Sequence, residues 1–266
     1  YRGYDSSGIA LTGNELYINK KEGKIAVLEE NLKPDDIKKF LTGIGHTRWA
    51  THGAPTDANA HPHVDCYNSI AIVHNGIIEN YAAIRKMLIE KGHTIKSQTD
   101  TEVIVHLIEY YMEKKYTLLE SVRKSVLQLE GTYGLLVISI KEPDTIIAAK
   151  NGSPILIGLG EDEIIIASDA SAIIEHTRKV IYPKDSEIVE IKNNTCKTYN
   201  LDKHSIDKEV EEIDWDITAI EKQGYDHFML KEIFEQPETI TNGFRGRMLP
   251  HIGNVRLDGL QLTSEE

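Results

Sequence analysis

Residues 45–53, with the sequence GHTRWATHG, concentrate side chains that can bind ligands or transfer protons. Two histidines, an arginine, a tryptophan and two threonines fall within these nine positions. Histidine also recurs further along, so that five of the eleven histidines of the chain lie between residues 46 and 74, namely His46, His52, His61, His63 and His74. Three kinds of site use such side chains: a metal site, an acid–base catalytic site, or a pocket for a small polar ligand.

The sequence gives little support to the first two kinds of site. His61, His63 and His74 could supply three imidazoles, but there is no HExxH motif, and Pro62 disfavours a helix that would align histidines four residues apart. The GxSxG motif of a serine nucleophile is also absent. We therefore expect no metal ion here, and we expect each of these histidines, taken alone, to be a structural residue.

A pocket for a small ligand accounts better for the other side chains of the stretch. Arg48 carries a planar fork of donors that suits a carboxylate. Thr51 and His52 add hydrogen-bonding groups on the same loop. Together these three side chains could bind one anionic end of a ligand.

Two further positions could complete such a pocket. Asn75 and Gly76 end a predicted buried strand, where an amide and a backbone N–H could both face a developing oxyanion. Asp100 stands at the start of a predicted helix and could accept an ammonium group, although its alternative role is part of a helix cap. The combination could hold an amino acid by both of its ends.

The elements that must position these residues follow from hydrophobic periodicity and turn residues. Helices are predicted over 35–41, 79–92, 99–115 and 117–131, the third with a capping box formed by Thr99 and Glu102, and another over 225–240, broken near Pro237. Strands are predicted over 7–13, 15–21, 42–49, 69–76, 132–140, 144–150, 153–160, 163–169, 179–183, 187–191 and 195–200, and a polar tail follows residue 205. Grouped helices followed by many short strands predict an α+β fold with antiparallel sheets.

Composition excludes several functional classes. The net charge is −12, and no long basic run is present, so we expect no nucleic-acid partner. No apolar run approaches the length of a membrane span, and no signal peptide is recognisable, so we expect a cytoplasmic protein without membrane contact. The two cysteines, Cys66 and Cys196, form no CxxC pair, and we interpret both as structural.

Eight motifs in chain order closely resemble the glutaminase domain of the glutamine–fructose-6-phosphate aminotransferases. They are YRGYDSSG (1–8), GHTRWATHG (45–53), NAHPH (59–63), VHNGIIEN (73–80), SQTDTEVI (97–104), NGSPILIGLG (151–160), ASD (167–169) and KEIFEQP (231–237). The resemblance implies an N-terminal-nucleophile hydrolase fold, a four-layer αββα sandwich of antiparallel sheets. It also implies a type 2 glutamine amidotransferase domain over 1–205, an extension and helix over 206–245, and a linker toward sugar isomerase domains over 246–266.

The same resemblance implies an activity and residue roles. The family's glutaminase hydrolyses L-glutamine to glutamate and ammonia without a cofactor, and further domains transfer the ammonia to fructose 6-phosphate. Asn75 and Gly76 would form the oxyanion hole, and Asp100 would hold the α-amino group with help from Gly76. Arg48, Thr51 and His52 would bind the α-carboxylate. Trp49 would lie on the loop that closes over glutamine, and Arg2 would support the site.

The sequence departs from the family pattern at both ends. The family's nucleophile is an amino-terminal cysteine whose α-amino group acts as the base. This sequence begins downstream of that position, at Tyr1, and it stops before the sugar isomerase domains. We therefore expect a chain of only these residues to be inactive and to lack the first strand and helix of the fold, and the full-length protein to be a homo-oligomer. The alternative is a non-catalytic glutamine-binding module.

Overall fold

The computed structural model describes residues 5–49, 53–213, 225, 227–244, 248–249 and 254–255. The chain divides into two units, Arg2–Asp214 and a second one formed by Tyr1 with Trp215–Glu266. Three of the predicted site residues, Arg2, Thr51 and His52, lie outside the described residues. Within the described part, none of the helices combines the length and the apolar character needed to cross a bilayer.

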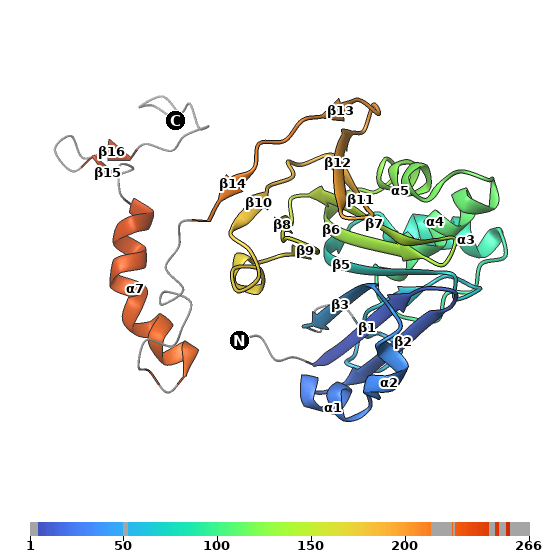
Figure 1. Cartoon of the computed structure of the whole chain (residues 1–266), viewed down its shortest axis with the longest axis horizontal. Helices are drawn as coiled ribbons and strands as arrows, with labels where there is room; N and C mark the ends of the chain where they lie inside the picture. The colour runs from blue at the N-terminus through green and yellow to red at the C-terminus, as the bar shows by residue number, and fades with distance from the viewer. Residues whose placement is uncertain are drawn as a thin grey trace. The chain divides into compact units, whose positions relative to one another are not determined.

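A seven-stranded antiparallel sheet forms the centre of the first unit (Figure 1). Its strands follow the order β13-β12-β11-β7-β6-β5-β4. Their bounds are β4 His63–Val64, β5 Ile70–Ile78, β6 Gly131–Ser139, β7 Glu142–Asn151, β11 Glu187–Lys192, β12 Thr195–Asn200 and β13 Ser205–Ile206. The long central strands are rich in Ile, Val, Leu and Ala because both faces of this sheet are covered.

Three helices cover one face of the central sheet, namely α3 (Tyr81–Glu90), α4 (Glu102–Glu113) and α5 (Leu118–Val126). Residues of α4 from Glu102 to Glu109 are all buried, so neighbouring elements cover most of this helix. Fully buried side chains such as Ile104, Leu107 and Leu135 join the helices to the sheet. This cluster supplies most of the hydrophobic stabilisation of the unit.

Two smaller sheets cover the opposite face of the central sheet. One has the order β2-β1-β3, with β1 at Ser6–Thr12, β2 at Leu16–Glu22 and β3 at Thr42–Arg48, and the short helices α1 (Ile25–Glu30) and α2 (Pro34–Ile37) follow β2. The other has the order β14-β10-β8-β9, with β8 at Leu156–Leu159, β9 at Ile164–Ala167, β10 at Lys179–Ile181 and β14 at Glu211–Glu212. A 3-10 turn, η1, spans Ala170–Ala172.

Two apolar clusters hold these smaller sheets against the central one. Ala10 and Ile44 of the three-stranded sheet pack against Ala71, Val73 and Ile138. A second cluster joins the four-stranded sheet to the central sheet through Ala148, Ile157, Ile181, Val189 and Ile191. The α+β prediction with antiparallel sheets is therefore confirmed, and the sheets stack face to face with the helices outside.

Some local predictions differ from the structure. Thr99 and Glu102 form no capping box, because the Glu102 carboxylate accepts the backbone N–H groups of Lys96 and Ser97 instead. The predicted polar tail after residue 205 begins with two short strands, β13 and β14. In the second unit, α7 (Phe228–Phe244) continues through Pro237, since a proline removes one hydrogen bond without obliging a helix to end. Strands β15 (Met248–Leu249) and β16 (Asn254–Val255) pair with each other.

Candidate active site

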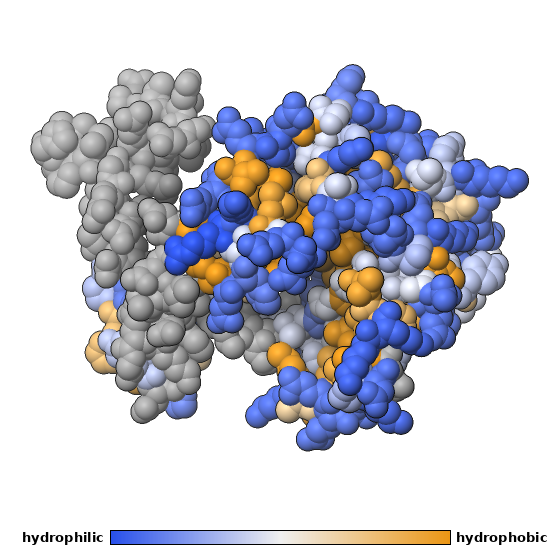
Figure 2. Space-filling view, viewed as in Figure 1, coloured by the Kyte–Doolittle hydropathy of each residue, from blue (hydrophilic) through white to orange (hydrophobic). Residues whose placement is uncertain are grey.

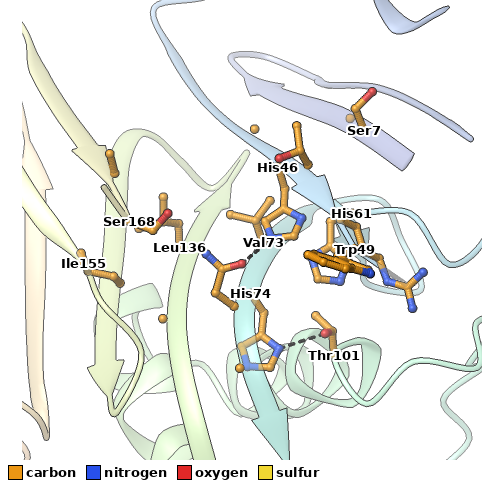
Figure 3. A pocket seen from close by; sticks show the side chains of 18 of the residues that line it. Ser7, His46, Trp49, His61, Val73, His74, Thr101, Leu136, Ile155 and Ser168 are labelled. Atoms are coloured by element: carbon orange, nitrogen blue, oxygen red, sulfur yellow. Dashed lines mark hydrogen bonds between the residues drawn. The ribbon is translucent and has the colours of Figure 1, made fainter. Parts of the chain in front are cut away.

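A cavity of about 790 Å³ lies among the three sheets of the first unit (Figure 3). Strands β1 and β3 line it on one side, β5 and β6 form its floor, and residues around β8 and β9 form the third wall. Figure 2 shows hydrophilic residues over most of the visible face, with hydrophobic ones in several patches between them. Of the predicted site residues that are described, Arg48, Trp49, Asn75, Gly76 and Asp100 all line this cavity.

Gly76 has a backbone conformation and surroundings that only glycine fits. Its φ is +137°, a value that residues with a Cβ rarely adopt. A Cβ at this position would stand 2.1 Å from the carbonyl oxygen of Thr132 on the neighbouring strand β6. The end of β5 therefore lies very close to β6. This packing sets the orientation of the backbone at Asn75 and Gly76.

The amide of Asn75 is oriented by His46 of strand β3. The His46 Nε2 atom lies 2.7 Å from the Asn75 Oδ1 atom. Because the amide oxygen can only accept, the imidazole carries its proton on Nε2, and the Asn75 NH₂ group keeps both its hydrogens for other partners. Burial lowers the pKa of His46 to about 4, so the ring is neutral at pH 7.

His74 links three elements behind the site. Its Nε2 donates to the carbonyl oxygen of Thr132 at 3.3 Å, and its Nδ1 consequently accepts from the Thr101 hydroxyl at 2.9 Å (Figure 3). Burial lowers the pKa of His74 as well. The ring thus ties β5 to β6 and to the residue that precedes α4, which keeps Asn75 and Asp100 on one side of the molecule.

Arg48 and Asp100 supply opposite charges to the same cavity. Arg48 is only 6% exposed, and its Nη2 donates to the carbonyl of Gly53 at 3.3 Å. Burial lowers the pKa of Arg48 while Asp100 and Asp5 act against this shift, and a guanidinium with so high an ordinary pKa stays charged. This buried cation can therefore bind an anionic ligand group strongly.

Asp100 does not cap a helix. Its Oδ2 accepts the backbone N–H of Ile78 at 2.8 Å, and α4 begins only at Glu102, with Thr101 as its N-cap residue. Its Oδ1 accepts no hydrogen bond from the residues that the structure describes. The alternative role considered from sequence is thus wrong, and the buried carboxylate is held by β5 beside the cavity.

The remaining histidines of the region hold the neighbouring loop. The ring of His61 lies against that of His46, with 4.4 Å between centroids, and His63 Nε2 lies 3.0 Å from the Thr99 hydroxyl. The Lys20 ammonium donates to the carbonyl oxygens of Ala60 and Pro62 at 2.7 and 3.1 Å. These contacts agree with the structural roles expected for the two rings.

The sequence analysis assigned no role to several residues that line the cavity. Thr132 receives the hydrogen bond from His74 and blocks any side chain at position 76, yet no motif marks it. Ile155, Ile166 and Ser168 form a wall opposite Trp49, whose side chain is 71% exposed. Thr132 belongs to β6, whereas the wall residues lie in or beside β8 and β9, so only the packing of the sheets brings both sets to the cavity.

Known proteins are similar to this chain in sequence. A family model described as the glutamine amidotransferase domain matches residues 46–175. The glutamine–fructose-6-phosphate aminotransferase (isomerizing) of Clostridium acetobutylicum is 45% identical over 267 residues, which cover 100% of this chain and 43% of that protein. The protein of the same name from Aquifex aeolicus is 48% identical over 249 residues, covering 92% of this chain and 41% of that protein. The chain thus spans less than half the length of these curated relatives.

Solved structures share the fold. The glutamine phosphoribosylpyrophosphate amidotransferase from B. subtilis, complexed with ADP and GMP, superposes with a TM-score of 0.63 at 27% identity and covers 75% of this chain and 44% of its own. A structure of the allosteric regulatory enzyme of purine biosynthesis gives a TM-score of 0.62, also at 27% identity. These likenesses confirm the predicted N-terminal-nucleophile hydrolase fold. The chain therefore belongs to the glutamine amidotransferases, in the form that the glutamine–fructose-6-phosphate aminotransferases carry in their amino-terminal part.

Proposed function

We propose that this chain is the glutaminase part of a glutamine–fructose-6-phosphate aminotransferase. L-Glutamine binds in the cavity and is hydrolysed to glutamate and ammonia, and the ammonia is transferred to fructose 6-phosphate by other domains of the full-length protein. Curated relatives at 45–48% identity that carry this name support the proposal. The proposal also includes a cytoplasmic, homo-oligomeric protein and a domain division at residues 205 and 245.

Glutamine is held by its two charged ends. Its α-carboxylate pairs with the buried Arg48 guanidinium, together with Thr51 and His52 of the same loop. Its α-ammonium group pairs with the Asp100 carboxylate and the backbone of Gly76. The electrostatic interaction between Arg48 and Asp100 supports this arrangement, because a zwitterion matches both charges at once.

The chemical step takes place at the side-chain amide of glutamine. A thiolate attacks the amide carbon, the carbonyl oxygen becomes an oxyanion, and the Asn75 NH₂ group and the Gly76 N–H donate to it. The C–N bond then breaks, the nitrogen leaves as ammonia after protonation, and water hydrolyses the thioester to glutamate. The nucleophile is the amino-terminal cysteine that the family resemblance implies, since neither Cys66 nor Cys196 lines the cavity.

The observation that carries the proposal is the pairing of His46 with the Asn75 oxygen. Because the amide oxygen of Asn75 faces His46 of β3, its NH₂ group points away from β3. Gly76 follows at the same end of β5, where the nearby Thr132 carbonyl leaves no room for a side chain. An amide donor and an N–H donor at adjacent positions are the arrangement that a developing oxyanion requires.

Substitution of Arg48 tests the binding mode. Arg48→Ala removes the fork that pairs with the α-carboxylate, and we expect glutamine affinity, measured by isothermal titration calorimetry, to fall by at least about 10-fold, a loss of ~1.4 kcal/mol. Arg178→Ala, which removes an arginine outside the cavity lining, is the matched control and should bind glutamine as the wild type does. Equal affinity in Arg48→Ala and the wild type would remove Arg48 from the binding site.

A non-catalytic glutamine-binding module is the second candidate, because no cysteine lines the described part of the cavity. Both candidates bind glutamine, but only the enzyme releases ammonia. A glutamate dehydrogenase-coupled assay on protein with an intact amino-terminal cysteine separates them. Turnover that is lost when this cysteine is changed to alanine supports the enzyme, and binding without turnover supports the module.

A further inference from the structure

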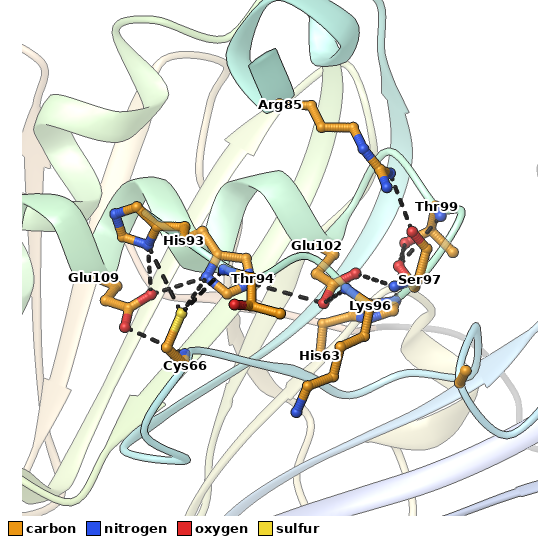
Figure 4. Close-up of polar contacts among 12 residues, drawn as sticks. His63, Cys66, Arg85, His93, Thr94, Lys96, Ser97, Thr99, Glu102 and Glu109 are labelled. Carbon is orange, nitrogen blue, oxygen red and sulfur yellow. Dashed lines mark hydrogen bonds and ion pairs between the residues drawn. The ribbon is translucent and has the colours of Figure 1, made fainter. Parts of the chain in front are cut away.

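A second cluster of reactive side chains lies outside the cavity, where the turn between β4 and β5 meets α4 and the residues that follow α3. It contains Cys66, His93, His106 and Glu109 (Figure 4). One ligand-type atom from each lies within 4.8 Å of all the others. Neither the glutamine site nor the amidotransferase chemistry uses any of these four residues.

The cluster is centred on one carboxylate oxygen. The Glu109 Oε2 atom lies 2.8 Å from the Nδ1 atoms of both His93 and His106. The Cys66 sulfur lies 3.6 Å from the Nδ1 of His106 and 4.0 Å from that of His93. Two imidazoles therefore direct the same ring nitrogen toward the same oxygen and the same sulfur, so that the four atoms surround a common point.

These separations are close to those of a tetrahedral zinc site. Zinc bond lengths of about 2.0–2.3 Å at tetrahedral angles place neighbouring ligand atoms about 3.3–3.6 Å apart. The two sulfur–nitrogen distances are near this range or slightly longer, whereas the two nitrogen–oxygen distances are shorter because hydrogen bonds close them. Metal binding would therefore require the Glu109 carboxylate to move away from the two rings as their hydrogen bonds to it are lost.

In metal sites, the ligands themselves contact further groups that orient them, and groups of this kind surround the cluster. The backbone N–H of Thr94 donates to the Cys66 sulfur at 3.5 Å. Burial and the Glu109 carboxylate raise the pKa of this thiol as long as no cation is bound, while the Thr94 N–H lowers that pKa. The Glu102 carboxylate lies on the side of the outer ring nitrogen of His106, at 3.6 Å, which is longer than the hydrogen bond of a carboxylate–histidine–zinc triad. Glu102 is itself held by two backbone N–H groups, from Lys96 and Ser97.

The turn that carries Cys66 is also rigid. Asp65 accepts the backbone N–H groups of Ser69 and Ile70 at 2.6 and 2.9 Å, and the Cys66 N–H donates to Glu109 Oε1 at 3.2 Å. His93 lies just after the end of α3, and its backbone N–H donates to the carbonyl oxygen of Leu88. The ligand atoms are thus placed by backbone contacts that do not depend on a metal.

We propose that Cys66, His93, His106 and Glu109 bind one zinc ion as a structural site. A thiolate, two imidazoles and a carboxylate are the ligand types that zinc accepts, and four protein ligands leave no open position for catalysis. Binding displaces the thiol proton and the protons between the rings and the carboxylate. The metal joins the β4–β5 turn and the segment after α3 to α4, just beyond the residues Asp100 and Thr101.

Metal content and spectroscopy test this proposal. Purified protein is stripped with a chelator, incubated with zinc sulfate and desalted, and zinc per chain is measured by inductively coupled plasma mass spectrometry. We expect about one zinc per chain in the wild type and in the matched control Cys196→Ser, whose cysteine lies in β12 outside the cluster, and at least about 10-fold weaker binding in Cys66→Ser. Zinc should also raise the thermal midpoint of the wild type and of Cys196→Ser, but not that of Cys66→Ser.

Cobalt replacement gives a readout that needs no variant to fold. Cobalt(II) added to the stripped wild type should give tetrahedral d–d bands and a thiolate-to-cobalt charge-transfer band. Zinc uptake that is equal in the wild type and Cys66→Ser, or a cobalt spectrum without the thiolate band, would overturn the proposal. Glutamine binding is measured separately on the same samples, so the failure of one proposal leaves the other standing.

Discussion

The oxygen and the NH₂ group of the Asn75 side-chain amide have different environments. Its oxygen accepts from His46, and its NH₂ group is thereby left for a ligand in the cavity. The neutral state of His46 matters here, because a protonated ring would add a buried positive charge beside Arg48. A single hydrogen bond at the base of the cavity therefore sets which groups can meet an oxyanion.

The Asn75 amide should contribute mainly to the chemical step of hydrolysis. In Asn75→Ala we expect kcat for ammonia release to fall by roughly 10²–10³-fold with little change in KM, because an oxyanion donor acts in the transition state. The measurement is a coupled ammonia assay on protein that carries its amino-terminal nucleophile. Asn14→Ala, an exposed substitution outside the cavity, is the control, and an unchanged kcat in Asn75→Ala would remove this residue from the oxyanion hole.

At the scale of secondary structure, the pattern T-x-x-E occurs before two helices but caps only one of them. Before α5, the Thr117 hydroxyl accepts the backbone N–H of Glu120, as an N-cap should. Before α4, the Thr99 hydroxyl contacts His63 and Ser97 instead. The difference arises from burial, because a fully buried α4 terminus has tertiary partners that compete with the local cap.

Removal of the Thr117 cap should lower stability measurably. We expect Thr117→Ala to reduce the free energy of unfolding by about 1 kcal/mol, since one N–H at the start of α5 loses its acceptor. Urea denaturation followed by circular dichroism measures this change. Thr117→Ser keeps the hydroxyl and should retain most of the stability, and an equal loss in both variants would mean that the methyl group, and not the cap, is responsible.

At the scale of the whole molecule, four histidines stay neutral around the cavity, and three of them, His61, His63 and His74, are buried. Burial lowers the pKa of His46 to about 4, and it lowers the pKa values of His61, His63 and His74 in the same direction. In the unfolded chain such rings titrate near 6.5. Between pH 6.5 and the lower folded values, the unfolded state therefore binds more protons than the folded state, and stability decreases as the pH falls.

Acid should therefore destabilise the protein before its carboxylates titrate. We expect the free energy of unfolding to fall from pH 7 to pH 5, with up to ~1.4 kcal/mol per pH unit from each buried ring below its unfolded pKa. The lowered pKa of Glu102, about 2, makes its stabilising contribution fade only below about 4.5, outside this range.

Urea titrations at several pH values measure this slope. His46→Gln should reduce it, because one ring that stays neutral on folding is gone. His204→Gln, at an exposed position, should leave it unchanged. A flat profile between pH 7 and pH 5 in the wild type would contradict the burial of these rings as neutral groups.

The sequence by itself determined the fold class and the family, and it singled out five residues that line one cavity. Hydrophobic alternation and turn residues are local signals, so β5, β6 and α4 could be predicted within a few residues of their bounds. The motifs around Arg48, Asn75 and Asp100 named residues that do line one cavity. Their chemical types favoured a ligand pocket over a metal or a catalytic site, and only the ordered series of motifs identified the ligand and the family.

Tertiary structure alone decided the contacts that cross between elements. The partner of Asn75 is 29 residues away, and the carbonyl that excludes a side chain at Gly76 lies on the neighbouring strand β6. Cys66, interpreted from sequence as an isolated structural cysteine, meets two histidines and a glutamate only because α4 lies under the β4–β5 turn. Contacts between residues distant in the chain depend on how sheets and helices pack, and local sequence patterns carry no record of that packing.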